Sequence, residues 1–172
     1  MRRAIIRTSD ELDRLCRIAA ASYFALMLVF IAIQVVARYL LQEPPTWTEE
    51  LARFAMVWGG LLGATISFKS RTDPVLMPPP GRRGSLLARS AGLARAGAVL
   101  IFLAPVLYFS LFGPGMNFAR GFLARSAQRT ADTLGFPMSY IAAAVPVMAI
   151  VVLVHLLARA AAKADGTGEA QP

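Results

Sequence analysis

Three charged residues and a tryptophan stand close together at the start of one apolar stretch: Trp47, Glu49, Glu50 and Arg53. Glu49 and Arg53 are four residues apart, so a helix places them on one face in the order of acid before base that favours an ion pair. Acidic side chains also suit a helix N-terminus, where free N–H groups point outward. This spacing supports ion pairing at the end of an apolar helix. One acid is left over for a base on another protein or for Arg38.

The residues that build catalytic, redox or metal sites are scarce. The chain has one histidine, His155, and one cysteine, Cys16. One thiol cannot form a disulfide within the chain, and these two residues cannot supply a zinc site, an iron–sulfur site or a haem held by two histidines. No glycine loop of the phosphate-binding type ends in Lys-Ser or Lys-Thr. We therefore predict no enzyme activity, no cofactor and no metal, and we expect His155 near a helix end.

The elements that position these residues are long and apolar. Of the 172 residues, 56% are hydrophobic and 16% are charged, whereas about a quarter of a soluble domain is charged. The hydrophobic residues fall in runs of about 20, the length that crosses the hydrocarbon core of a bilayer. We predict an all-α integral membrane protein with four transmembrane helices and short interfacial helical segments, in a single domain of residues 1–163. The spans are expected at about 17–40, 47–68, 88–112 and 138–158.

Proline and glycine mark the connections between these spans. Pro44-Pro45 breaks the chain after the first span, and three prolines exclude a helix at residues 78–80. Gly113-Pro114-Gly115 ends the third span or bends it sharply. Ser9 is followed by two acids and is a good N-cap, so we expect a short amphipathic helix to begin there, before the first span.

Two further segments are expected at the membrane surface or outside the membrane. Residues 116–137 are mildly amphipathic, and Phe118, Phe122 and Leu123 can enter the membrane surface. The tail of residues 164–172 is small and polar, which predicts disorder.

Small residues recur at every fourth position of the second span, at Ala55, Gly59, Gly63 and Ser67. A ladder of this kind lets another helix approach closely, and with charge at its head it indicates a protein interface. The alternative is a capped helix start with an ion pair, and small residues that recur by chance. The candidate partner interface consists of Arg38, Trp47, Glu49, Glu50, Arg53, Ala55, Trp58, Gly59, Gly63 and Ser67.

An ordered pattern runs through residues 38–69. Arg38-Tyr39 is followed by Trp47-x-Glu49-Glu50-x-x-Arg53 and then by Trp58-x-x-Leu61-x-Gly63-Ala64. The pattern resembles the small membrane subunit of tripartite ATP-independent periplasmic (TRAP) transporters, the DctQ family. A weaker similarity lies at Leu134-Gly135-Phe136-Pro137 and continues through Tyr140 to Pro146. Family members often carry a histidine just after the second span, where this chain has Ser70-Arg71-Thr72-Asp73, so a role for that histidine is not carried over.

The resemblance implies an accessory membrane subunit of a secondary transporter. In TRAP systems, a large polytopic subunit carries substrate and sodium, and a periplasmic binding protein delivers the substrate, typically an organic acid. The small subunit packs against the large one and enlarges its fixed scaffold. The implied partners are the large subunit, the binding protein in transient contact, and membrane lipid.

Two other classes of membrane protein remain as alternatives. A self-sufficient small four-helix exporter acting as a homodimer usually needs a carboxylate inside its first span, where this chain has only Gln34. A membrane enzyme or electron-carrier subunit is opposed by the single histidine and single cysteine.

The positive charge of the chain indicates orientation rather than nucleic-acid binding. The net charge is +8, but the basic residues flank the spans. Five lie in the N-terminal tail, five after the second span and two in the C-terminal tail, against three in residues 113–137. Because basic residues favour the cytoplasmic side, we predict a multi-pass protein of the bacterial inner membrane with both termini in the cytoplasm.

Overall fold

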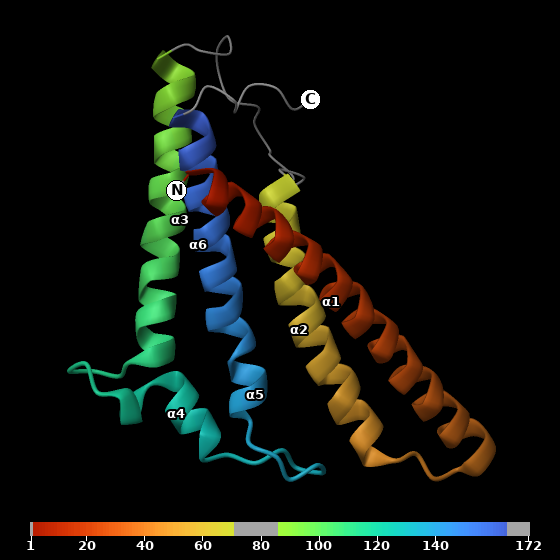
Figure 1. Cartoon of the computed structure of the whole chain (residues 1–172). Helices are drawn as coiled ribbons and strands as arrows, with labels where there is room; N and C mark the ends of the chain where they lie inside the picture. Colours follow the sequence, from red (N-terminus) through yellow and green to blue (C-terminus); the bar gives the residue numbers. More distant parts are fainter. Residues whose placement is uncertain (1, 71–85, 165–172) are drawn as a thin grey trace.

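The computed structural model describes residues 2–70 and 86–164 (Figure 1). The elements in chain order are α1 (Arg2–Val36), a π-helical turn η1 (Ala37–Leu41), α2 (Thr46–Ser70), α3 (Leu86–Leu111), a 3₁₀ turn η2 (Phe118–Arg120), α4 (Phe122–Ala127), α5 (Ser139–Ala142) and α6 (Ala144–Ala164). Four helices are long and apolar enough to cross a membrane. The prediction of an all-α membrane protein with four spans is confirmed.

The first helix is continuous from Arg2, so the prediction that a separate helix begins at Ser9 is wrong. The segment before the apolar run is rich in Arg, which is a good helix former, and the helix passes through Ser9 without a break. At 1.5 Å per residue, the 35 residues of α1 extend about 52 Å. The hydrocarbon core is about 30 Å thick, so the polar N-terminal part of α1 extends beyond it.

The helix ends follow the proline and glycine signals. Gln42 adopts a left-handed conformation (φ 57°) and closes the π-helical turn before Pro44-Pro45. The hydroxyl of Thr48 donates a hydrogen bond of 2.6 Å to the carbonyl of Pro45 at the start of α2. α3 remains helical through Pro105 and ends at Leu111.

Two glycines allow the chain to cross itself after α3. A side chain at Gly113 would collide with the backbone of Arg120, and one at Gly121 would collide with the carbonyl of Leu111. η2 lies between these two glycines and α4 follows the second. Phe118 and Phe122, which we expect to enter the membrane surface, are both exposed on them.

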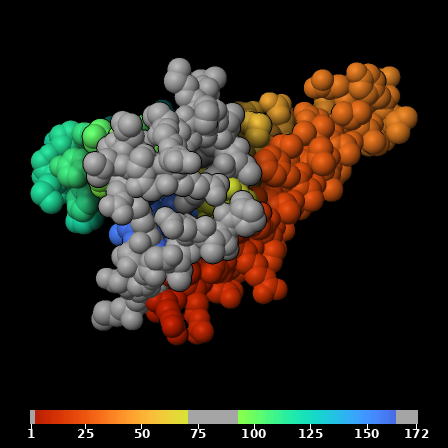
Figure 2. All heavy atoms as spheres, turned by 90° about the horizontal axis from the view of Figure 1, so that it is seen from above, coloured from red at the N-terminus to blue at the C-terminus, as the bar shows by residue number. Residues whose placement is uncertain are grey.

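The four long helices form two arms that join at one end. α1 packs along α2, and α6 packs against α1, α2 and α3 (Figure 1). One apolar cluster joins α1, α2 and α6 through Cys16, Leu62 and Val151. A second joins α3 and α6 around Leu103 and Val152. Towards the other end, the α1–α2 pair slants away from α6, and the α1–α2 turn extends far from the rest of the molecule (Figure 2).

Some sequence predictions fall on segments about which the structure provides no description. The proline-rich residues 78–80 and the tail residues 165–172 lie outside the described ranges, as do residues 71–73 of the segment where relatives often carry a histidine. Ser70 is the last residue of α2, and Ala164, which we predicted as the first residue of the tail, is the last residue of α6.

Candidate functional site

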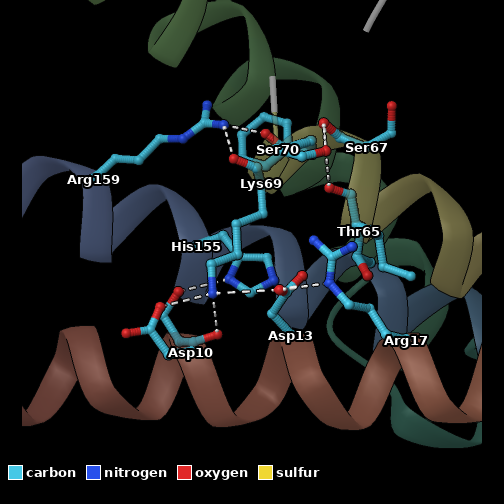
Figure 3. Close-up of polar contacts among 12 residues, drawn as sticks. Asp10, Asp13, Arg17, Thr65, Ser67, Lys69, Ser70, His155 and Arg159 are labelled. Atoms are coloured by element: carbon cyan, nitrogen blue, oxygen red, sulfur yellow. Dashed lines mark hydrogen bonds and ion pairs between the residues drawn. The ribbon is translucent and has the colours of Figure 1, made fainter. Parts of the chain in front are cut away.

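Charged and polar side chains gather where α1, α2 and α6 meet at the end that holds the N-terminus (Figure 1). We call this group the terminal cluster: Ser9, Asp10, Asp13, Arg17, Lys69, His155 and Arg159. The amine of Lys69, on α2, donates to the carbonyl of Ser9 at 3.0 Å and to Oδ1 of Asp10 at 2.9 Å. It also lies 3.7 Å from Oδ2 of Asp13, which accepts from Nε of Arg17 at 3.0 Å (Figure 3). Lys69 therefore joins α2 to the first turns of α1.

α6 enters the terminal cluster through His155 and Arg159. His155 is only 1% exposed, and its Nδ1 lies 2.8 Å from the hydroxyl of Ser9 on α1. Arg159 donates to the carbonyls of Phe68 and Lys69 at the end of α2, and its guanidinium carbon lies 4.4 Å from the centre of the Phe68 ring (Figure 3). The expectation that His155 lies near a helix end is wrong, because it lies well inside α6. It is buried there because α1 supplies a hydroxyl partner.

The terminal cluster offers ion pairing and hydrogen bonding between three helices. Within the described residues, Oδ1 of Asp13 and Nε2 of His155 are buried and have no hydrogen-bond partner. The described part of the chain contains no group of three or more His, Cys, Asp or Glu residues able to hold a metal ion. Buried polar groups of this kind hold a structure in one arrangement, because each broken contact leaves a desolvated group unsatisfied.

At the opposite end of α2, Glu49 and Arg53 form the ion pair that their spacing predicts. Oε1 of Glu49 lies 2.9 Å from a terminal nitrogen of Arg53, and both side chains are 62% exposed. An exposed pair of this type contributes at most about 1 kcal/mol. Within this chain the pair therefore stabilises the helix only slightly, and both side chains remain accessible to another protein.

Glu50 has a different role from the one that we predicted. Its carboxylate accepts hydrogen bonds from the backbone N–H groups of Asp132 and Thr133, both at 3.0 Å, and from the hydroxyl of Thr133. The prediction that Arg38 is its partner within the chain is wrong, because the connector after α4 uses this acid. A contact of Glu50 with another protein stays a prediction. Close by, the rings of Phe54 and Phe136 pack edge to face with 5.4 Å between their centres.

Asp132 and Thr133 are thus site residues that sequence reasoning missed. Their contacts are made mainly through backbone N–H groups, which carry no sequence signature. The available signal was indirect: the connector continues directly into Leu134-Gly135-Phe136-Pro137, the second stretch of family resemblance.

One half of the small-residue ladder is buried, with Gly59 against α1, whereas Gly63 in the other half has open space around it. Ala55 and Gly59 are buried, and a side chain at Gly59 would meet Tyr23 and Phe24 of α1 at 3.4 Å. A side chain added at Gly63 would meet nothing within 4 Å. Four residues turn a helix by about 400°, so the ladder drifts by about 40° at each step and moves off the face that α1 covers.

The tryptophans of the candidate interface also touch α1. Trp58 stacks on Tyr23 with 5.9 Å between ring centres, and Trp47 packs edge to face against Phe30 at 6.4 Å. Trp47 nevertheless remains 40% exposed, Arg38 is exposed, and Ser67 is partly buried. Nine of the ten candidate residues thus lie along α2 but on different faces, some against α1 and Glu50 against the connector, and Arg38 lies across the turn on η1.

Comparison with protein families gives one result that decides the class of this protein. The model of the DctQ component of the tripartite ATP-independent periplasmic transporters matches residues 27–166. The chain belongs to the DctQ family. This confirms the resemblance seen in residues 38–69 and makes the protein a small membrane component of a TRAP transporter, a family of transporter components rather than of enzymes. Comparison with curated proteins and with solved structures finds no match.

Only part of the terminal cluster lies within the residues that match the DctQ family. Lys69, His155 and Arg159 lie within the matched residues, whereas Ser9 and Asp13 on the first turns of α1 precede them. Glu50 and its partners on the connector lie inside the match. This DctQ chain therefore joins a segment outside the matched range to helices within it through Lys69 and His155.

Proposed function

We propose that this chain is the accessory small membrane subunit of a TRAP-type secondary transporter. It packs against the large transport subunit and scaffolds it during ion-coupled uptake of an organic acid, which a periplasmic binding protein delivers. The observation that carries this proposal is the DctQ family match over residues 27–166, because a DctQ component implies a complex with a large membrane subunit and a binding protein.

The distribution of ionisable residues supports a scaffold rather than a transport path. Residues 18–37, 54–68, 96–111 and 139–154, which form the middle of the four spans, contain no Asp, Glu, Lys, Arg or His. Transport proteins usually carry such a residue deep in the bilayer, since its cost is retained only for function. The charges of the described helices lie instead towards the two ends of the bundle.

The surface of α2 that α1 leaves uncovered is the proposed contact with the large subunit. Gly63 offers space for a close helix approach, and the exposed Glu49–Arg53 pair lies at the head of the same helix. Trp47 and Arg38 extend this surface to the α1–α2 turn, which projects from the rest of the molecule (Figure 2).

Substitution of Gly63 by leucine tests this contact. Because a Cβ at this position meets nothing within 4 Å, the folded subunit itself should tolerate the change. A partner helix packed closely there would be overpacked at a cost of about 1–3 kcal/mol, which lowers its affinity by about fivefold to more than a hundredfold. Copurification of the large subunit with the tagged chain measures this loss. Gly97→Leu, at a position on α3 where an added Cβ also meets nothing within 4 Å, is the matched control.

The proposed orientation has both termini in the cytoplasm of the bacterial inner membrane. It is supported by twelve basic residues in the two tails and after the second span, against three in residues 113–137 and two, Arg38 and Arg53, near the α1–α2 turn. A reporter active only in the periplasm should be active when fused in the α1–α2 turn at Pro45 and inactive at the C-terminus. Activity at the C-terminus with none at Pro45 would reverse the orientation and place the terminal cluster on the outer side.

A further inference from the structure

An apolar groove lies between α2 and α3, at the level of the last turn of α2. Its volume is about 350 Å³, and it is lined by Phe68 of α2, by Ala98, Val99, Phe102 and Leu103 of α3, and by Val152 of α6. α3 packs against α6 and α4, so α6 forms the floor of the groove and α2 and α3 form its walls. Phe102 is 65% exposed, which shows that the groove is open to the surroundings of the bundle.

Two arginines stand at the end of this groove that faces the terminal cluster. Arg159 follows Val152 by seven residues on α6, which is two helical turns and about 10 Å along the same face. Its guanidinium lies over the ring of Phe68, which itself lines the groove. Arg95 precedes Val99 by four residues on α3, about 6 Å along the same face, and it is exposed. α3 and α6 run in opposite directions (Figure 1), so both cations lie beyond the same end of the groove.

Two acidic residues of the adjoining terminal cluster already have cationic partners. Asp10 and Asp13 of α1 pair with Lys69, and Asp13 also pairs with Arg17. The groove therefore combines a long apolar wall with positive charge at one end. That combination matches an anionic phospholipid, whose acyl chain needs an apolar surface and whose phosphate needs a cation.

We propose that this groove binds one anionic phospholipid. An acyl chain lies along Phe68, Val99 and Phe102, and the phosphate lies between Arg95 and Arg159. The guanidinium groups are suited to this because they present several N–H donors to phosphate oxygens. The side chain of Arg95 reaches the head-group level from the first apolar turns of α3, as long basic side chains do near a membrane surface. This site is independent of the contact proposed for Gly63.

Native mass spectrometry of the full-length chain, extracted in mild detergent with the complex that contains it, tests the proposal. The probes are phosphatidylglycerol and phosphatidylcholine with identical acyl chains. We expect preferential retention of phosphatidylglycerol. Arg95→Gln and Arg159→Gln should each lower its affinity about fivefold, the effect of one basic residue near an anionic lipid. They should affect phosphatidylcholine less, because its choline group offsets the charge of the same phosphate. Arg95 is exposed, so its variant separates loss of the site from loosening of the fold.

A second pair of variants tests the groove itself. Ala98→Trp fills the groove from an exposed position and should reduce retention of both lipids, whereas Ile101→Trp, which is on the same helix and 77% exposed but does not line the groove, should not. Equal retention of the two lipids, or retention unchanged in both arginine variants, would contradict the proposal. If Ala98→Trp lowers recovery of another protein and leaves lipid retention unchanged, the groove holds a partner helix and the proposal is wrong.

Discussion

Replacement of Lys69 by methionine is expected to lower the free energy of unfolding by about 2–3 kcal/mol. Lys69 is the cation that joins α2 to α1, and its side chain is only 22% exposed. Its removal leaves Asp13, which is 13% exposed, with Arg17 alone, and the loss of one member of a buried pair typically costs about 3–5 kcal/mol. The remaining pair with Arg17 reduces this cost.

The change at Lys69 is measurable as a fall in Tm of roughly 4–12 °C, since 1 kcal/mol corresponds to about 2–4 °C in a chain of this size. Fluorescence-detected size exclusion of heated detergent extracts gives this value. Asp10→Asn is the matched control, because its side chain is 63% exposed and its pair with Lys69 should contribute at most about 1 kcal/mol. Adding Asp13→Asn to Lys69→Met should restore part of the loss. A Tm that Lys69→Met does not change would show that the contacts of Lys69 with α1 contribute nothing to stability.

Replacement of Glu50 by alanine is expected to release the connector that carries Asp132 and Thr133. The carboxylate accepts hydrogen bonds from both backbone N–H groups and from the hydroxyl of Thr133. Because the variant lacks these hydrogen bonds, the two amides should exchange with solvent about tenfold faster. The packing of Phe136 against Phe54 should loosen with them. Hydrogen–deuterium exchange of a peptide that spans residues 128–138 measures the effect.

Glu49→Ala is the control for Glu50→Ala. It removes a carboxylate from the neighbouring position, but its partner is the exposed Arg53 on the same helix. Exchange in residues 128–138 should therefore stay at the level of the unchanged protein. Similar acceleration in both variants would indicate a general effect of charge on α2, and the specific link between Glu50 and the connector would have to be given up.

The long helices were predictable because their signals are local. Apolar runs of about 20 residues identified the four spans, and Pro44-Pro45 and Gly113-Pro114-Gly115 correctly marked where two of them end. The start of α1 was mispredicted, since a serine followed by acids is a good N-cap in isolation. In the structure, the hydroxyl of Ser9 bonds to His155 instead.

The contacts between distant segments were not predictable from one sequence. Ser9 and His155 are separated by 146 positions, and nothing in either segment specifies the other. Lys69 looked like one of several basic residues that set orientation, and only the packing of α1 on α2 shows that it joins two helices. The ladder was recognised correctly as a set of small residues, but which of them α1 covers depends on how α1 crosses α2.

The central claim is that this DctQ chain holds the transporter together and does not touch the substrate. The measurement that tests it most directly is uptake per assembled complex. This is the sodium-driven uptake in liposomes, divided by the amount of large subunit that copurifies with the tagged chain. For Gly63→Leu we expect less complex, but the same uptake per complex and the same order of preference among organic acids. A normal amount of complex with an altered substrate preference, or transport by this chain alone, would place it in the transport path and contradict the account.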